Sequence, residues 1–181
     1  MKYYKKVKLK SGEMCILRNS NCEDAKKILQ HMILTSGETE NMLRYPDEIK
    51  MTEAEESEYL SDIEASPDSI MLSAVVDGKV VASAGLGPVS KLEKCRHRAD
   101  FGISIQKKYW GCGIGSCIMS AIIETARQAG YEQIELDVVA DNQRAINLYK
   151  KYGFKIFGTN EKAFRCRNGQ YQTLHLMSCR L

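Results

Sequence analysis

A strand-like segment followed by a glycine-rich loop constrains this chain more than any other feature. Residues 99–105, ADFGISI, alternate like a strand, and 111–116, GCGIGS, then open a segment with helical apolar spacing. A loop of this kind turns several backbone N–H groups toward one point at the positive end of a helix, where they can hold phosphate. Three glycines alternating over five residues are unusual for a plain helix-entry turn. The segment therefore predicts a phosphate-bearing ligand.

The two standard phosphate loops do not fit these residues. A P-loop ends in Gly-Lys-Ser/Thr, whereas Gly115 is followed by Ser116 and Cys117. The dinucleotide fingerprint needs a third glycine where Ser116 stands, and its glycines follow the strand directly. A nucleotide-binding protein would also need a Walker lysine or an acidic ribose ligand about 20 residues further on. The pattern favours a phosphate-bearing ligand of another type.

The rest of the chain reads as one α/β domain, 1–181, without repeats or linkers. Asp77-Gly78 is a favoured two-residue hairpin turn, and Thr52 to Glu55 has the capping-box pattern. Residues 1–13 are an N-terminal extension or an edge strand. The patterns predict strands at 14–20, 69–76, 79–87, 96–105, 132–139, 154–159 and 171–179, and helices at 22–34, 52–66, 114–129 and 142–152.

Composition excludes several classes of protein. The basic N-terminus is not followed by the apolar run of a signal peptide, so we expect no secretory leader. No stretch approaches the roughly 18 apolar residues that a membrane span needs. Seven cysteines, an odd number, indicate free thiols in a reducing cytosol, so we expect a cytoplasmic protein. A net charge of +3 is too small to indicate nucleic-acid binding. The charge is uneven, because residues 38–64 carry −8 and the remainder +11. The acidic block is either a cation-binding wall or a solvated helix face.

Two motifs resemble the GCN5-related N-acetyltransferase (GNAT) family. The family's Gln/Arg-x-x-Gly-x-Gly/Ala loop falls on residues 110–115, with Trp110 in place of Gln or Arg. Residues 140–154, ADNQRAINLYKKYGF, resemble the family's Asn-x-x-Ala-x-x-Leu-Tyr-x-x-x-Gly-Phe. A helix and a strand separate the motifs, as in the family. The resemblance, which covers 14–181, implies a mixed, mostly antiparallel sheet with flanking helices and a strand-loop-helix acyl-CoA site.

The resemblance also implies which residues bind acetyl-CoA, the co-substrate. Asn142 would contact the pantetheine arm, and Tyr149 would protonate the departing thiolate as general acid. Lys107, Lys108 and Lys151 are candidates for additional positive charge near the phosphates. The backbone of Ile103, Ser104 and Ile105 would hydrogen-bond the pantetheine amides, and the N–H groups of Gly111, Cys112, Gly113, Ile114, Gly115 and Ser116 would hold the pyrophosphate.

The sequence does not single out one residue as the general base. Glu135, which alternation places on the same strand face as Asp137, is one candidate, and Asp100 is another. His97 is a weaker one, and a water molecule without a dedicated base is an equal alternative. Cys95 and His97 lack the further ligands that a metal site needs, so we expect no metal.

In this family the first two helices and their connection often shape the acceptor site. Here that region contains the acidic block, so we expect a cationic amine beside Glu38, Glu40 and Asp47. The predicted function is an acetyl-CoA-dependent N-acetyltransferase that acts on a primary amine of a small molecule or peptide by direct attack in a ternary complex. The alternative is a non-catalytic acyl-CoA sensor or partner-binding module. We expect no nucleic-acid or membrane partner, and the sequence leaves open a homodimer.

Overall fold

An eight-stranded sheet forms the centre of the structure, a computed structural model that describes residues 1–181. Its strand order is β1-β2-β3-β4-β5-β6-β8-β7, and every neighbouring pair is antiparallel except β5 with β6. The predicted α/β class with a mostly antiparallel sheet is confirmed. The strands are β1 (Tyr4–Lys8), β2 (Met14–Asn19), β3 (Ile70–Val76), β4 (Lys79–Pro88), β5 (Arg98–Ile105), β6 (Gln133–Val139), β7 (Lys155–Arg165) and β8 (Tyr171–Arg180); the helices are α1 (Ala25–Glu38), α2 (Glu53–Ala65), α3 (Ile114–Gln128) and α4 (Gln143–Lys151).

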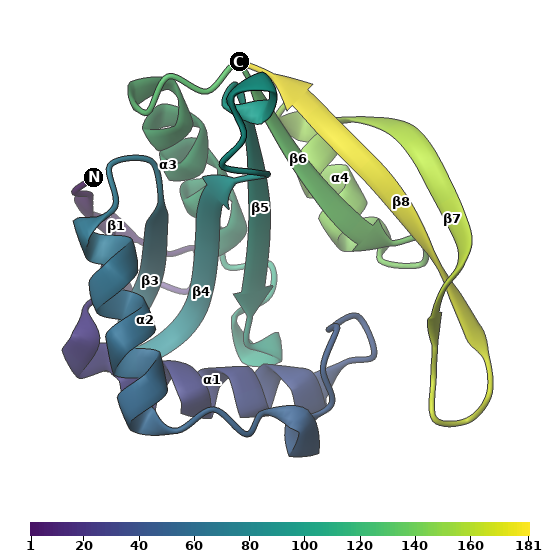
Figure 1. The fold of residues 1–181 in the computed structure, drawn as a ribbon. Coiled ribbons are helices and arrows are strands. Elements are labelled where there is room, and N and C mark those ends of the chain that lie inside the picture. Colours follow the sequence, from purple (N-terminus) through teal and green to yellow (C-terminus); the bar gives the residue numbers. More distant parts are fainter.

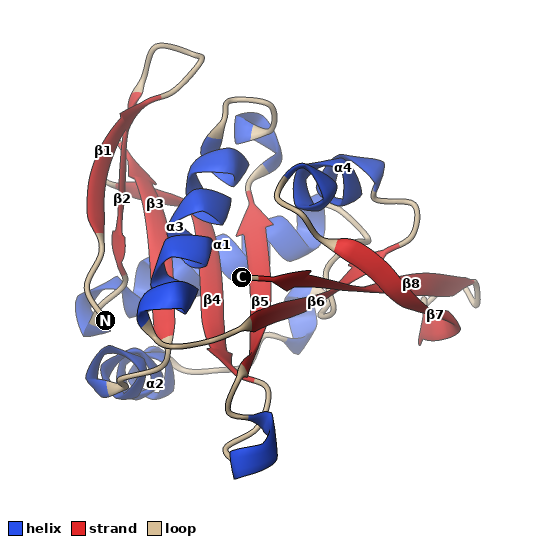
Figure 2. Cartoon of the chain, turned by 90° about the horizontal axis from the view of Figure 1, so that it is seen from above, coloured by secondary structure: helices blue, strands red, loops and turns tan.

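The four helices cover both faces of the sheet. Helices α1 and α2 lie over one face, and α3 and α4 lie over the other (Figures 1 and 2). None of them has the length and apolar character that crossing a lipid bilayer requires. All seven cysteines are free thiols.

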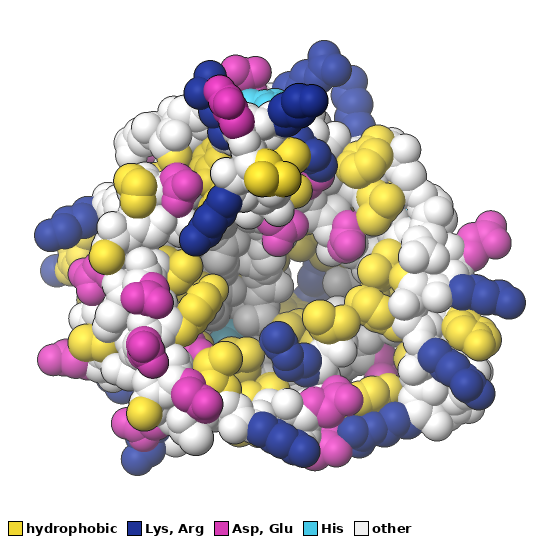
Figure 3. Space-filling view, viewed as in Figure 1, with side chains coloured by type: hydrophobic (Ala, Val, Ile, Leu, Met, Phe, Trp, Pro, Cys, Tyr) yellow, Lys and Arg dark blue, Asp and Glu magenta, His cyan; other side chains and the backbone are white.

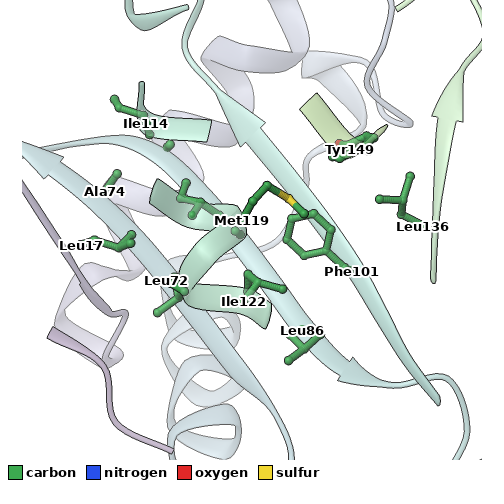
Figure 4. Packing of buried hydrophobic residues seen from close by; sticks show 14 of the residues in the cluster. Leu17, Leu72, Ala74, Leu86, Phe101, Ile114, Met119, Ile122, Leu136 and Tyr149 are labelled. Carbon is green, nitrogen blue, oxygen red and sulfur yellow. The ribbon is translucent and has the colours of Figure 1, made fainter. Parts of the chain in front are cut away.

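The main core lies between the sheet and α3. Figure 4 shows Met119 and Ile122 of α3 packed beside Phe101 of β5. The exposed fraction of Met119 and of Ile122 is 0%, and that of Phe101 is 3%. Each such side chain contributes about 1.5–3 kcal/mol when it is removed from water. The apolar face of α3 therefore anchors the glycine-rich loop that precedes it.

Two elements end more than three residues beyond the position that the sequence predicts. Helix α1 continues to Glu38 rather than ending at residue 34, because Thr35 and Ser36 are buried and the Thr35 hydroxyl donates to the His31 carbonyl. Strand β7 extends to Arg165 rather than to residue 159, since pairing with β8 continues through two irregularities in register. Residues 4–8, within the predicted extension, form strand β1 at the sheet edge beside β2.

Candidate active site

The sheet divides between β5 and β6. These parallel strands pair only where Arg98–Asp100 lies beside Gln133–Glu135, and they then separate (Figures 1 and 2). On its other side, β5 stays paired with β4 as far as Ile105. The second half of β5 therefore has one free backbone edge, which faces the gap.

Alternation along β5 identifies which backbone groups face this gap. The N–H of Gln106 donates to the Val81 carbonyl at 3.0 Å, so even-numbered residues of β5 direct their backbone groups toward β4. The backbone groups of Phe101, Ile103 and Ile105 consequently face the gap. Of the three strand residues in the predicted acetyl-CoA site, Ile103 offers its N–H and carbonyl and Ile105 its N–H, because the Ile105 carbonyl accepts from Trp110. The main chain of Ser104 is paired with β4.

A cleft of about 1290 Å³ follows this gap across the molecule. Figure 3 shows its opening as a hollow on the face that carries α1 and α2. One end is lined by the glycine-rich loop and the start of α4, and the other by the connection between α1 and α2. The cleft therefore joins the phosphate-type loop to the region expected to bind an acceptor.

The glycine-rich loop has free N–H groups at the start of α3. Gly111 and Gly113 have φ angles of 78° and 98°, in the left-handed region that favours glycine. The N–H groups of residues 113–116 donate to no backbone carbonyl, and 114–116 are the first residues of α3. Unpaired donors at the positive end of a helix are suited to phosphate oxygens.

Gly115 serves packing rather than loop conformation. A Cβ atom on Gly115 would lie 2.9 Å from Cδ2 of Leu148 and 3.4 Å from Cδ1 of Ile105. The absence of a side chain therefore lets α3 approach α4 and the end of β5. Trp110, which replaces the usual Gln or Arg, donates from Nε1 to the Ile105 carbonyl at 2.8 Å and so fixes the loop to β5.

The positive charge at this end of the cleft comes from residues other than the predicted lysines. Lys10 lines the cleft because its N–H donates to the Cys112 carbonyl at 3.1 Å, which brings the β1–β2 turn to the loop. Arg144 also lines it, with its guanidinium carbon 4.5 Å from the centroid of the Trp110 ring. The lining does not include the lysines at 107, 108 and 151.

Tyr149 reaches the cleft from within the core. Its ring packs edge-on to Phe101, with centroids 6.3 Å apart (Figure 4). The centroid of the Tyr149 ring also lies 5.9 Å from that of Phe154. Burial raises the pKa of the Tyr149 hydroxyl to about 12. No protein group is hydrogen-bonded to this hydroxyl, although Tyr149 lines the cleft. It therefore remains protonated and has its proton available to a ligand.

Asn142 joins the cleft at the start of α4. Its Oδ1 accepts from the N–H of Ala145 at 3.2 Å, so the side chain caps the helix. The side-chain nitrogen has no partner in the protein and can donate to a ligand. Capping and ligand binding are therefore compatible at this residue.

The structure does not bring Glu135 into the cleft. Its carboxylate forms a two-point ion pair with Arg98, at 2.5 Å to Nε and 2.7 Å to Nη2, and also accepts from Gln133. The Arg98 hydrogen bonds hold the pKa of Glu135 below its usual range. A carboxylate in this state is a weak proton acceptor, and Glu135 is absent from the cleft lining.

Asp100, the second candidate for the general base, lies in the cleft, and Asp137 lies there too. They line the cleft on the two strands that separate there. The pKa of Asp100 is raised by burial and by repulsion from Asp137 and Glu135, and the pKa of Asp137 is raised by burial and by Glu135. His97 lies outside the cleft lining, and its carbonyl accepts from residues 132 and 133.

This chain matches a known protein family. Residues 38–154 match the model of the acetyltransferase (GNAT) family, which is more than half of the chain. The chain belongs to the GNAT family. It is an acyltransferase, as the sequence predicted.

Relatives and solved structures agree with this assignment. L-amino acid N-acetyltransferase AaaT of Escherichia coli (strain K12) is 37% identical over 113 residues, which cover 62% of this chain and 68% of AaaT. A GNAT-family acetyltransferase from Streptococcus pneumoniae superposes with a TM-score of 0.88 at 28% identity, covering 92% of this chain and 99% of that one. The yncA protein of Salmonella typhimurium, whose structure includes acetyl-CoA, superposes with a TM-score of 0.80 at 17% identity, over 91% and 92%.

The region expected to bind the acceptor differs from the expected acidic wall. Glu38 accepts from the N–H of Lys107 at 2.7 Å, and Asp47 is ion-paired with Arg167; neither lines the cleft, nor does Glu40. The segment between α1 and α2 instead presents mainly apolar and neutral side chains and Arg44, which is exposed and has no ion-pair partner. These lining residues are Thr39, Asn41, Met42, Leu43 and Arg44.

The same segment is tied to the hairpin of β7 and β8. Nη2 of Arg167 donates to both carboxylate oxygens of Asp47, and the backbone N–H of Arg167 donates to the Tyr45 hydroxyl. The guanidinium carbon of Arg167 lies 4.1 Å from the centroid of the Tyr45 ring. Gln172 donates to the Glu40 carbonyl at 3.1 Å. We call these contacts the bridge, because they join two elements on opposite sides of the cleft (Figure 1).

Several residues that line the cleft or lie beside it were not predicted from the sequence. Lys10 is far from the loop along the chain, and only the β1–β2 pairing brings it near. Arg144 follows Asn142 by two residues, so the motif itself was an available signal. Arg44 and the buried His31 gave no distinguishing pattern.

Proposed function

We propose that this acetyltransferase moves an acetyl group from acetyl-CoA to the amino group of a small α-amino acid or close analogue, by direct attack in a ternary complex. The observation that carries the proposal is the row of free backbone groups on β5, the N–H and carbonyl of Ile103 and the N–H of Ile105, which leads to the unpaired N–H groups of the loop. A ligand with amides at one end and phosphates at the other fits this order of groups. Acetyl-CoA has that order.

The order of groups along the cleft also indicates which part of acetyl-CoA each residue would contact. The backbone groups of Ile103 and Ile105 and the side chain of Asn142 hydrogen-bond the pantetheine arm. The N–H groups of residues 113–116 hold the pyrophosphate, and Lys10 and Arg144 add charge. The bound thioester then supplies an activated acetyl group near Tyr149.

The transfer requires two proton movements. As the bond from acetyl carbon to nitrogen forms and the bond to sulfur breaks, the amine gives up a proton and the thiolate gains one. Amino groups are largely protonated at neutral pH, so a base must act before or during attack. We assign this role to Asp100, acting directly or through a water molecule, because its pKa is raised and it lines the cleft. Tyr149 donates the other proton, to sulfur.

Charge at the acceptor end supports an amino acid as the substrate. Asp100 and Asp137 provide negative charge for an ammonium group, and Arg44 provides a guanidinium for a carboxylate. The name of AaaT indicates that a GNAT relative acts on L-amino acids. Together these observations favour a small zwitterion over a polyamine or a protein.

The test is thiol release from acetyl-CoA with a panel of L-amino acids, simple amines and polyamines, with a thermal shift by acetyl-CoA measured alongside. We expect a rise in melting temperature with acetyl-CoA and release with one or a few amino acids. Turnover confined to polyamines would overturn the acceptor assignment. A thermal shift without release from any amine would instead favour the non-catalytic alternative.

A further inference from the structure

His31 is a buried titratable residue for which the proposed reaction has no use. It lies on α1 with an exposed fraction of 1%, and both ring nitrogens have partners. Nε2 lies 2.8 Å from Oγ of Ser104, and Nδ1 lies 3.4 Å from Nε2 of Gln106. Because the imidazole is buried between two polar side chains, each ring nitrogen must either donate or accept a hydrogen bond.

The direction of these hydrogen bonds follows from the Val80 carbonyl. Nε2 of Gln106 also lies 2.9 Å from this carbonyl, which can only accept, so the Gln106 atom is the amide nitrogen. That nitrogen donates its second hydrogen to Nδ1 of His31, which must therefore carry a lone pair. The ring proton of neutral His31 is then on Nε2 and is donated to Ser104. Burial supports the neutral form, because it lowers the pKa of His31 to about 4.

Ser104 is left with a hydroxyl proton that has no acceptor in the protein. Its Oγ already accepts from His31 and has no other protein partner. The side chain lines the cleft on the same face of β5 as Asp100 and Gly102. Because the main chain of Ser104 is paired with β4, its contribution to the cleft is this hydroxyl, presented as a donor.

We propose that His31 and Gln106 are positioning residues that fix Ser104 as a hydrogen-bond donor to the carboxylate of the acceptor amino acid. This inference rests on the proposed function for the acceptor class. Asp100 and Ser104 are four residues apart, or about 13 Å along the strand. A Cβ at Gly102, between them, would meet no protein atom within 4 Å. A small zwitterion therefore has room there. It is shorter than this span, so a carboxylate oxygen can accept from Ser104 while a water molecule links the amine to Asp100.

The hydrogen-bond direction is tested first, without any substrate. The chain has three histidines, so the ¹⁵N resonances of His31 can be assigned with a His31→Gln control. We expect the neutral tautomer with the proton on Nε2 at pH 7. A proton on Nδ1 would overturn the proposal, because Ser104 would then donate to His31 instead of to the cleft.

Kinetics with matched substrates test the role of Ser104. The probes are the best L-amino acid of the panel and the amine obtained by its decarboxylation. We expect Ser104→Ala to raise KM for the amino acid about tenfold or more and to leave KM for the amine and for acetyl-CoA unchanged. His31→Gln should also raise KM for the amino acid. Ser104→Thr, which keeps a hydroxyl, should have a KM close to that of the wild type.

Controls separate this proposal from the function on which it rests. Ser73→Ala removes a buried hydroxyl that bonds Ser20 away from the cleft, and it should leave every KM unchanged. A rise in KM for acetyl-CoA with Ser104→Ala, or an equal rise for the amine and the amino acid, would overturn the assignment to the carboxylate. If no amine is acetylated by the wild type, the proposed function fails, whereas the tautomer of His31 is still decided by its resonances.

Discussion

At the scale of single residues, the environment of each ionisable group determines its role in the cleft. The sequence suggests both Tyr149 and Glu135 as catalytic residues. In the structure, the Tyr149 hydroxyl has no protein partner, whereas the Glu135 carboxylate is ion-paired with Arg98. Burial favours the neutral hydroxyl, and the guanidinium favours the charged carboxylate. The two residues are therefore suited to different purposes, acid catalysis and structure.

Replacing Tyr149 by Phe should lower kcat by about 10²-fold, because the departing thiolate loses its proton donor. KM for both substrates should stay near the wild-type value in steady-state assays. Tyr131→Phe is the matched control, since its hydroxyl is also in a buried residue but donates to the Asp68 carbonyl. An equal loss of kcat in both variants would contradict the acid role of Tyr149.

Replacing Asp100 by Asn should likewise lower kcat by about 10²-fold at neutral pH, because the amine loses its proton acceptor. Raising the pH should recover part of this loss, since more of the amine is then neutral in solution. Glu135→Gln should lower the melting temperature by breaking the Arg98 ion pair, with kcat retained. The assignment fails if Glu135→Gln, rather than Asp100→Asn, abolishes turnover.

His31 should make the stability of the protein depend on pH. Its pKa is about 4 in the folded protein and about 6.5 in an unfolded chain, so the unfolded state binds a proton that the folded state does not. Stability is therefore lost as the pH falls through 6.5 and toward 4. Between pH 7.5 and 5.0 the loss should be about 2 kcal/mol, measured by urea unfolding. His31→Gln should remove this component, and identical slopes in the two proteins would refute it.

At the scale of elements, the contact of α3 with α4 and β5 sets the position of the glycine loop. The Cβ of an alanine at 115 would press on Leu148. We expect Gly115→Ala to lower the free energy of unfolding by about 1 kcal/mol more in the wild type than in a Leu148→Ala variant, because the smaller side chain at 148 relieves the overpacking. Unfolding free energies of the four proteins measure this coupling. Gly113→Ala should show no such coupling, because its cost comes from a φ of 98°.

Local elements were predictable from sequence, and long-range geometry was not. The β3–β4 hairpin follows from Asp77 and Gly78, whose φ angles of 47° and 74° are those of the expected tight turn. The end of α1 was misjudged because burial of Thr35, a tertiary effect, outweighs its polarity. The sequence pattern placed Glu135 on a strand, on the same face as Asp137. Its pairing with Arg98 was not predictable, because it depends on the short parallel register of β5 and β6.

At the scale of the whole molecule, the bridge joins the two sides of the cleft at the end where we propose that the acceptor binds. Its ion pair is exposed, so it contributes little to stability. Its effect is to restrain the segment that carries Leu43 and Arg44. We expect Arg167→Ala to raise KM for the acceptor several-fold and to leave the melting temperature and KM for acetyl-CoA nearly unchanged. Arg180→Ala, on the exposed end of β8, is the control, and an equal effect on both substrates would contradict this role.

The gap between β5 and β6 has a consequence for the behaviour of the protein in solution. A free strand edge on a protein surface invites another chain to add a strand, which leads to aggregation. The edge formed by Phe101, Ile103 and Ile105 lies inside a cleft, with β6 and β8 turned across its far side (Figure 2). A slender ligand can run along it, whereas we expect the walls of the cleft to keep out a strand that belongs to a second folded protein. The same divergence that leaves backbone groups open to a ligand should thus protect the protein from pairing with its own copies there.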